Sequence, residues 1–446
     1  MSSTVFDSDL FRDMFGTAEM RAIFSDAGYL ARCLEVEAAL ARAQAREGVI
    51  PEAAAREITA KADLSCVDLA RLKRETEIVG YPILPLVRQL AAACAGDCGG
   101  FVHWGATTQD IMDTAVVLQL RAAFGQLETD LLDILASLEA LARRYRDTPM
   151  AGRTHLQQAL PVTFGYKAAV WRSPLARHRE RLAQLRPRVL VGQFGGAAGT
   201  LASLGDKGLA VRAGLMRELG LGESAITWHV ARDGFAEAVL FTGLLTGSLA
   251  KIASDVMMMM STEFGEVFEP FEHGRGASST MPQKRNPISS ELILACAKLV
   301  RQHCAQMLDA MVQDFERATG PWHAEWIALP QSFIATAGAM KQARVMLAGL
   351  SVDTARMQRN LELTSGLIVA EAVMMGLAPK LGRQAAHDVV YDACRAAAES
   401  GRSLLELLCA DVQVSPHFGR PELERLLDPR NYLGSAAAMV DLSLRG

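Results

Sequence analysis

An unbroken helical repeat between Ile111 and Arg146 constrains the fold more than any other feature of the sequence. Apolar side chains recur there at alternating spacings of three and four residues, at Val117, Leu120, Phe124, Leu127, Leu131, Ile134, Leu138, Leu141 and Tyr145. No proline interrupts the segment, so the pattern predicts one helix of roughly 35 residues, about 50 Å long at 1.5 Å per residue. A helix of that length outgrows a compact single domain and predicts a bundle of long helices.

Two more segments carry helical patterns. Residues 27–47 are amphipathic, with Glu37 at the margin of an apolar face made by Leu30, Cys33, Leu34, Ala38 and Ala41. A second seam consists of Leu245, Leu249, Ile252, Val256 and Met259, beside the small residues Gly243, Gly247, Ser248 and Ala250. Small residues at such positions permit close approach of a neighbouring helix, so we expect this seam to pack inside the bundle.

Proline, asparagine and glycine residues predict where the later helices begin and end. Asn286 is expected to cap a long helix, with Pro287 at the first helical position, and this helix should run towards Glu316. Pro330 is expected to separate it from a further helix. Shorter helices should follow Leu361, with breaks near Gly382 and Gly401. The pattern predicts an all-α protein with three helical domains, at residues 1–100, 101–350 (the central long-helix bundle) and 351–446.

Composition narrows the class of function. The 46 basic and 50 acidic residues give a formal net charge of -4 without a one-signed block, which argues against a nucleic-acid or membrane surface. Residues 1–7 carry no signal-peptide pattern, so a cytoplasmic location is expected. Eight cysteines scattered among apolar residues are typical of reduced core thiols.

The sequence gives no pattern for a metal or a nucleotide cofactor. Cys94, Cys98 and His103 lack a fourth ligand at zinc-site spacing, and the methionines at 257–260 are expected to fill core gaps. The glycine-rich run at 192–199 has the wrong spacing for a dinucleotide loop, so it predicts a tight connection.

Three polar segments stand out against the helical background. Residues 103–110 read HWGATTQD and lead into the longest predicted helix, residues 152–157 read GRTHLQ, and residues 276–287 read GASSTMPQKRNP, followed by Glu291. Hydroxyl and amide groups at helix starts favour anions, because unpaired backbone N–H groups and the helix dipole lie there. These segments therefore predict a site for carboxylate groups.

Together the three segments resemble the motifs of the fumarase/aspartase superfamily, in that family's order. The third segment matches the superfamily signature S-S-x-M-P-x-K-x-N-P-x-x-x-E at every fixed position. The resemblance implies that Ser278 is the base at the carbon next to a carboxylate and that His155 is the general acid, oriented by Glu291. It also implies that carboxylates are bound by Thr107, Thr108, Gln109, Thr154, Lys284 and Asn286. The motif residues His103, Gln157, Ser279 and Met281 are expected to contact the substrate as well.

The physical chemistry of the implied reaction sets a condition on Ser278. Removal of a proton beside a carboxylate builds a doubly charged aci-carboxylate, which must be stabilised in the transition state. A serine hydroxyl is a very weak base in water, so a positive and dry surrounding must ionise it, and Lys284 with the loop amides is the available source. Residues 265–282 are rich in glycine and proline and predict a mobile loop that carries Ser278 and closes before chemistry.

Further segments resemble the branch of bacterial 3-carboxy-cis,cis-muconate cycloisomerases, among them IFSD at 23–26, QFGG at 193–196 and WHAEW at 322–326. This resemblance implies lactonisation of a tricarboxylate diene in aromatic-acid catabolism. Some members of the branch carry Trp in place of His155 and a small residue in place of Glu291, whereas here the pair is intact.

Two alternatives therefore stay open. The first is a C–N lyase that releases fumarate from an N-substituted aspartate, as in the adenylosuccinate lyases. The second is a catalytically silent structural protein on the same scaffold. Under the enzyme readings the resemblance implies a homotetramer with active sites shared between subunits, no cofactor, and a small polycarboxylate substrate.

Overall fold

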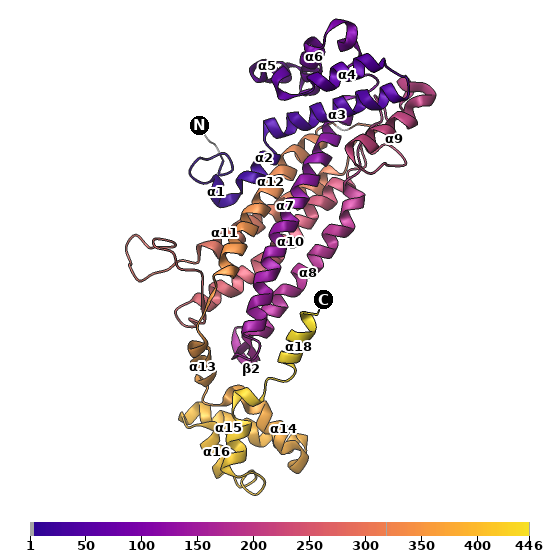
Figure 1. Cartoon of the computed structure of the whole chain (residues 1–446). Helices are drawn as coiled ribbons and strands as arrows, with labels where there is room; N and C mark the ends of the chain where they lie inside the picture. The colour runs from indigo at the N-terminus through magenta and orange to yellow at the C-terminus, as the bar shows by residue number, and fades with distance from the viewer. Residues whose placement is uncertain (1–3, 318, 446) are drawn as a thin grey trace. The chain divides into compact units, whose positions relative to one another are not determined.

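The computed structural model describes residues 4–317 and 319–445 and is dominated by helices (Figure 1). Within these residues strands form two small antiparallel pairs, β1 (Pro149–Thr154) with β2 (Gln157–Thr163) and β3 (Val267–Phe268) with β4 (Ser351–Val352). The predicted all-α class is confirmed. The chain divides into two compact units, one of Met1–Leu132, Arg177–Ala250 and Glu291–Gln342 and the other of Asp133–Ala176, Lys251–Ser290 and Ala343–Gly446. The predicted division near residues 100 and 350 stays a prediction.

Unit 1 contains an amino-terminal group of helices and parts of the long helices. The amino-terminal helices are α1 (Arg12–Phe15), α2 (Ala18–Ile23), α3 (Asp26–Arg46), α4 (Glu52–Lys61), α5 (Leu69–Val79) and α6 (Ile83–Ala93), and α9 (Gly208–Leu219) joins them. Helix α3 buries the predicted apolar face against α4, α9 and the start of α7 (Thr108–Arg144), and the margin residue Glu37 is buried with it.

The longest helix confirms the sequence pattern that predicted it. Helix α7 spans 37 residues, and all nine side chains of the seam are buried, including Tyr145 just beyond its end. The helices α8 (Phe164–Val189), α10 (Asp233–Met260), α11 (Ile288–Ala310) and α12 (Pro321–Ala348), like α7, have residues in both units. A single apolar seam therefore supplies core residues to two units.

Helix α10 also packs as its seam predicted. All five seam residues are buried, and a Cβ atom at Gly243 would lie 2.5 Å from the Cys304 sulfur of α11. Glycine is needed there because the two helices approach closely. Helix α10 is long and apolar enough to cross a membrane by length and composition, but 56% of the apolar window is buried inside the protein, as in a core helix.

The structure corrects two predicted boundaries. Helix α11 ends at Ala310, short of Glu316, because Val312 and Phe315 beyond it are exposed and no core packing extends the helix. Pro330 lies inside α12, which begins at Pro321. Its missing N–H costs a helical hydrogen bond, about 3 kcal/mol in a helix interior, but burial of Leu329 and Phe333 beside it outweighs that cost.

The predicted cap of α11 is also wrong. The backbone N–H groups of Ser289 and Ser290 donate to the two carboxylate oxygens of Glu269, at 3.0 and 2.8 Å, and the Ser290 hydroxyl adds a third hydrogen bond. Glu269 is buried and comes from the preceding loop. A carboxylate caps a helix better than an amide because it also meets the positive end of the helix dipole.

Unit 2 contains a carboxy-terminal helical group. Its helices are α13 (Thr354–Glu362), α14 (Ala370–Leu381), α15 (Arg383–Ser400), α16 (Leu404–Ala410), α17 (Arg420–Leu426) and α18 (Ala436–Ser443). The predicted breaks are confirmed: Gly382 separates α14 from α15, and Gly401 ends α15 in the left-handed conformation that glycine adopts without strain.

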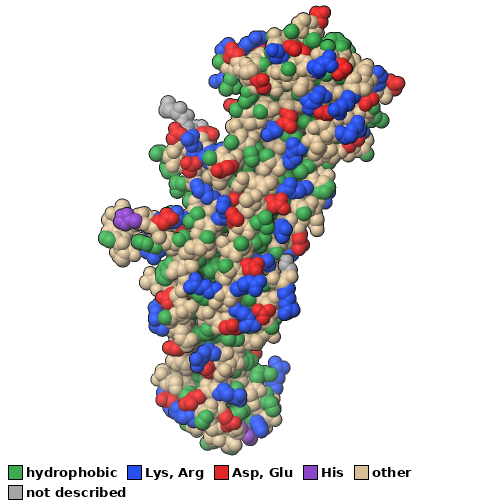
Figure 2. Space-filling model, viewed as in Figure 1, with side chains coloured by type: hydrophobic (Ala, Val, Ile, Leu, Met, Phe, Trp, Pro, Cys, Tyr) green, Lys and Arg blue, Asp and Glu red, His purple; other side chains and the backbone are tan. Residues whose placement is uncertain are grey.

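The structure also shows how charged residues and cysteines are distributed. On the face shown in Figure 2, basic and acidic side chains are interspersed, with no large region of one sign. All eight cysteines are free, and the residues the structure describes contain no group of three or more His, Cys, Asp or Glu that would hold a metal ion.

Candidate functional site

In unit 1, a buried carboxylate organises the first polar segment. The Asp110 Oδ1 atom accepts hydrogen bonds from the Gly195 N–H and from His229 Nε2, both at 2.8 Å, and Oδ2 accepts from the N–H groups of Thr107 and Gly196, at 3.0 and 2.9 Å. Asp110 therefore ties the start of α7 to the glycine-rich run. This run is a loop, as predicted.

The glycines of that run are required by close contacts. A Cβ atom at Gly195 would lie 2.8 Å from the Thr227 hydroxyl, and Gly196 has a φ of +72°. The backbone N–H groups of both residues can therefore reach the Asp110 carboxylate only because neither residue has a side chain. The sequence alone did not indicate this role, although Asp110 belongs to the first polar segment.

His103 is held by a buried partner from α3. Its Nδ1 atom lies 2.6 Å from Glu37 Oε1, and its φ of +61° is uncommon for a residue other than glycine. Burial alone would lower the pKa of His103, but the charge of Glu37 and the hydrogen bond to it outweigh burial, so the pKa is raised. Charged His103 is thereby favoured beside the predicted carboxylate-binding residues.

Glu37→Gln should therefore lower the pKa of His103 and reduce the stability of the folded protein at acidic pH. A raised folded pKa adds stability that is fully present below the unfolded pKa of about 6.5 and is lost as pH rises through the folded pKa. The melting-temperature difference between wild type and Glu37→Gln should be largest near pH 6 and shrink towards pH 8.5. Glu35→Gln is the matched control on α3, since Glu35 pairs with Arg32 at the surface. A difference that does not change with pH would contradict the role of the His103 charge.

The remaining residues of this segment differ in the hydrogen bonds that their side chains already form. The Thr107 hydroxyl accepts from Arg317 Nη1 at 2.8 Å, and Thr108 is the first residue of α7. Gln109 is buried, and its Nε2 atom donates to Asp113 Oδ2 and to the His229 carbonyl, at 3.1 and 2.8 Å. A substrate contact by the Gln109 amide N–H groups would have to compete with these hydrogen bonds.

Arg317 is a cation that the sequence reasoning missed. Its Nη2 atom donates to the Ala197 carbonyl at 2.8 Å, so both recorded partners, this carbonyl and the Thr107 hydroxyl, are neutral. Among residues 4–317 and 319–445, no carboxylate forms an ion pair with Arg317. Arg317 therefore brings positive charge to the start of α7.

In unit 2, the second segment forms the tip of the β1–β2 hairpin. Thr154 pairs with Gln157 across a two-residue turn whose residues, His155 and Leu156, have φ values of +51° and +64°. Such a turn normally uses Asn or Gly, so two bulky residues there carry backbone strain of the kind found at functional sites. The tip residues 154–157 are all exposed, with Leu156 75% exposed.

A buried ion pair anchors this hairpin below its tip. Both terminal nitrogens of Arg153 donate to the Glu266 carboxylate, at 2.9 and 2.7 Å, and Asn360 Nδ2 donates to the same group at 2.7 Å. Glu266 is fully buried and begins the strand segment that leads to the third polar segment. The base of the hairpin is therefore rigid although the tip is exposed.

The third segment is an open loop between β3 and α11, as predicted (Figure 1). Its base is closed by an isolated bridge between Ala277 and Arg285 and by a hydrogen bond from the Asn286 N–H to the Gly276 carbonyl at 2.9 Å. Gly276 has a φ of +67°, and a Cβ atom there would lie 2.5 Å from the Asn286 carbonyl oxygen. Only glycine permits this closure.

Ser278 sits inside the closed part of this loop. Its Oγ atom accepts the N–H groups of Thr280 and Met281, at 3.3 and 3.1 Å. Two backbone donors on one oxygen stabilise negative charge on that oxygen. Ser279, Met281 and Lys284 are exposed, and Asn286 is half-buried.

The structure thus groups the predicted residues into two sets. His103, Thr107, Thr108 and Gln109 lie together at the start of α7 in unit 1. Unit 2 holds the hairpin tip and the Ser278 loop. Glu291 lies in the first turn of α11, on the unit 1 side of the boundary, so its pairing with His155 stays a prediction.

Comparison with known proteins places these motifs in a family context. A family model described as lyase matches residues 15–301, and another, described as adenylosuccinate lyase C-terminus, matches residues 366–442. The chain is 48% identical over 445 residues to 3-carboxy-cis,cis-muconate cycloisomerase from Pseudomonas aeruginosa, covering 99% of this chain and 97% of that protein. It is 50% identical over 429 residues to trans-aconitate decarboxylase 1 from Mycosarcoma maydis, covering 96% and 87%. The crystal structure of a fumarate lyase from Mesorhizobium sp. BNC1 matches with a TM-score of 0.92 at 56% identity, covering 97% and 98%.

Proposed function

Because the chain belongs to the fumarase/aspartase superfamily and is an enzyme of that superfamily, we propose that it lactonises 3-carboxy-cis,cis-muconate. The observation that carries the chemistry is Ser278 Oγ, which receives two backbone N–H groups in a glycine-closed loop. The choice of substrate is supported by the 48% sequence identity, over 445 residues, to a protein named 3-carboxy-cis,cis-muconate cycloisomerase.

The proposed reaction needs one proton donor and one charge sink. A substrate carboxylate oxygen adds to the double bond, and the electron pair moves to the carbon next to a second carboxylate, which spreads the charge as an aci-carboxylate. The Ser278 hydroxyl then gives that carbon its proton, and its oxygen is left negative between the N–H groups of Thr280 and Met281. Lys284 and Asn286 of the same loop are proposed to bind the carboxylate that carries the charge.

Further carboxylates are proposed to bind at the start of α7. The first N–H groups of this 37-residue helix lack intrahelical partners, and the helix dipole favours anions there. Arg317 and charged His103 add positive charge beside Thr107 and Thr108. A substrate with several carboxylates fits this arrangement better than a neutral one.

A direct assay tests the proposal. Ultraviolet absorbance should fall when the enzyme is incubated with 3-carboxy-cis,cis-muconate, because the conjugated diene is lost on lactonisation. Parallel incubations with N-substituted and S-substituted succinates should leave the ultraviolet absorbance unchanged, because no unsaturated acid is released from them. Release of fumarate without consumption of the diene would overturn the first candidate.

The second candidate is elimination of an amine from a substituted succinate. The intact pair His155 and Glu291 favours it, because an amine leaving group gains more from a positioned general acid than an internal carboxylate does. The 56% identical structure is named a fumarate lyase. In this reading Ser278 removes the proton and His155 protonates the departing group.

A double-substitution cycle at His155 and Glu291 separates the two candidates. If the residues act as one acid, His155→Ala and Glu291→Gln should each lower turnover by about 10²-fold, and the double variant should be little worse than His155→Ala alone. The measurement is steady-state kinetics on the substrate that the absorbance assay finds. Effects that multiply independently would contradict the pairing and favour the cycloisomerase, which does not require this acid.

We also propose that the enzyme is a homotetramer whose sites combine motifs from different chains. Large apolar side chains remain exposed on the long helices, among them Leu132 on α7, Val170 on α8, Leu244 on α10 and Leu308 on α11. Such a pattern favours further helix packing between copies.

Mixing inactive variants tests the shared sites. Ser278→Ala and His155→Ala, unfolded mildly and reassembled at equal amounts, should regenerate activity in about one quarter of the sites, since each motif is intact in half of the chains. Ser278→Ala mixed with Lys284→Ala is the matched control, because both substitutions affect the same loop. Mixtures that stay inactive despite proven subunit exchange would exclude shared sites.

A further inference from the structure

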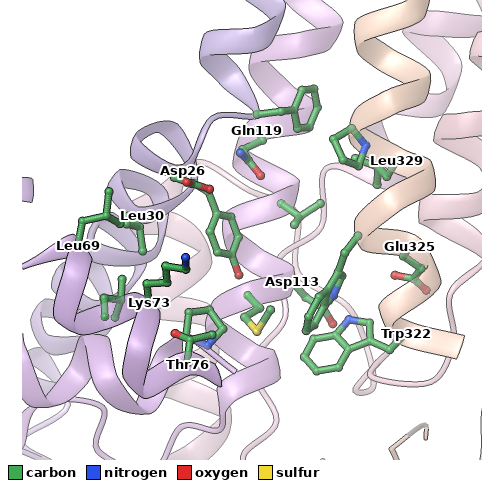
Figure 3. A pocket seen from close by; sticks show the side chains of 18 of the residues that line it. Asp26, Leu30, Leu69, Lys73, Thr76, Asp113, Gln119, Trp322, Glu325 and Leu329 are labelled. Atoms are coloured by element: carbon green, nitrogen blue, oxygen red, sulfur yellow. The ribbon is translucent and has the colours of Figure 1, made fainter. Parts of the chain in front are cut away.

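A cavity of about 490 Å³ lies in unit 1, along α7 beyond the first polar segment (Figure 3). Helices α3 and α5 line it on one side and α12 on another, with Met112, Asp113, Val116 and Gln119 of α7 between them. Among the described residues its lining includes none of the predicted catalytic or substrate-binding side chains. Its volume falls within the usual range for small-molecule sites, roughly 300–1,000 Å³.

Aromatic rings form much of the wall. Trp322 and Trp326 of α12 meet at a centroid distance of 5.3 Å with an interplanar angle of 77°, and Phe24, Tyr29 and Phe235 also face the cavity. Tyr81 stacks behind Trp322 at 5.6 Å and fixes its ring. Ring faces arranged around one space attract cations through their quadrupoles.

The charged groups around the cavity are mainly acidic. Asp26, Glu77, Asp113 and Glu325 line it, against the single ammonium of Lys73. Arg232 lies behind the wall and binds both Asp113 and Glu325, with four hydrogen bonds between them. One guanidinium shared by two carboxylates leaves a net negative charge on that side of the cavity.

One further polar group adds acceptor capacity. The Tyr29 hydroxyl lines the cavity and is buried without a hydrogen-bond partner by geometry, although the Cys33 thiol, a weak hydrogen-bonding group, lies beside it. A buried hydroxyl left unpaired is costly, and a ligand N–H would satisfy it.

We propose that this cavity binds an organic ammonium ion with an apolar body. The aromatic walls receive the cation, the acidic lining neutralises it, and the Tyr29 oxygen accepts an ammonium N–H. A tricarboxylate is disfavoured here, so the cavity is distinct from the place proposed for 3-carboxy-cis,cis-muconate. The Asp113 side chain accepts a hydrogen bond from Gln109, which connects an occupied cavity to the first polar segment.

Calorimetric titration with three probes of similar size tests the proposal, because it measures binding and does not depend on enzymatic turnover. Benzyltrimethylammonium and phenethylamine should bind, and phenylacetate should bind at least about tenfold more weakly, because its charge is repelled. Trp326→Leu should weaken both cations by about tenfold. Trp104→Leu is the matched control, since Trp104 is 44% exposed, similar to Trp326 at 37%, and lies outside the cavity.

The hydroxyl of Tyr29 gives a sharper test. Tyr29→Phe should weaken phenethylamine about fivefold, through loss of one hydrogen bond, but leave benzyltrimethylammonium within about twofold, because a quaternary ammonium has no N–H to donate. Asp26→Asn should weaken the binding of both cations and leave folding unchanged, because Asp26 is exposed. Equal or tighter binding of phenylacetate, or cations that bind Trp326→Leu as well as wild type, would overturn the proposal.

Steady-state kinetics then distinguishes two origins of the bound ammonium group, the leaving amine of a substrate and a separate ligand. If the ammonium group is the leaving amine of a substrate, benzyltrimethylammonium should raise KM and leave kcat unchanged. If it is a separate ligand, kcat should change or neither constant should respond. Binding measured by calorimetry stands in either case, so failure of the proposed cycloisomerase activity does not remove this site.

Discussion

Ser278→Ala should lower turnover by about 10³-fold, equivalent to about 4 kcal/mol of transition-state stabilisation, while the protein stays folded. We propose that the Ser278 hydroxyl transfers the proton at the reacting carbon. Among the described residues of this loop, no other side-chain oxygen accepts the N–H groups of Thr280 and Met281. Its removal leaves the N–H groups of Thr280 and Met281 in a solvent-accessible loop, so stability should hardly change.

The measurement is kcat on the substrate found by the absorbance assay, with circular dichroism and thermal melting to check folding. Ser400→Ala, at an exposed position on α15, is the matched control and should behave as wild type. Turnover near wild type in Ser278→Ala would remove Ser278 as the proton-transfer group and direct attention to Ser279. Loss of substrate binding with unchanged kcat would assign Ser278 a binding role instead.

Arg232→Met should lower the apparent free energy of unfolding by about 3–5 kcal/mol, the largest stability effect that we expect. Arg232 is fully buried and donates to Asp113 and Glu325, so its loss leaves two carboxylates buried without a counter-charge. Burial already raises the pKa of Glu325 although Arg232 opposes the shift. The Arg232 guanidinium also lies over the rings of Trp228 and Phe235, at 5.3 and 4.8 Å, and these contacts would be lost too.

Neutralising the partners tests this explanation. The triple variant Arg232→Met, Asp113→Asn, Glu325→Gln should recover part of the loss in urea unfolding, because buried amides cost less than buried carboxylates. Arg188→Met is the matched control: Arg188 pairs with Glu237 at the surface, so its loss should leave the unfolding midpoint nearly unchanged. A triple variant less stable than Arg232→Met would show that lost packing, and not unpaired charge, dominates.

Local patterns were sufficient for much of the fold. The seam of α7, the seam of α10 and the apolar face of α3 were each predicted from spacing alone and are buried in the structure. The breaks at Gly382 and Gly401 were predicted for the same kind of reason. Each of these features depends on residues within a few turns of one another, so the sequence carries the whole signal.

The candidate site also separates into features that the sequence showed and features that it did not. The three polar segments and the residues within them were visible as sequence motifs. The structure confirms the helix start at the first segment and the loop at the third, whereas the second segment forms the tip of a β-hairpin that the sequence did not predict. Their chemical roles remain predictions, because each role depends on how segments from different parts of the assembly meet.

Long-range partners were decided by the tertiary structure alone. Glu269 caps α11 in place of Asn286 from about twenty residues away, Glu37 binds His103 from 66 residues away, and Asp110 binds Gly195 from 85 residues away. Pro330 stays inside α12 because buried neighbours outweigh its lost hydrogen bond. A buried polar group takes whichever partner the fold brings within about 3 Å, and no local pattern specifies that partner. The sequence by itself thus determined the helices and the motifs, and packing decided which charges and caps support them.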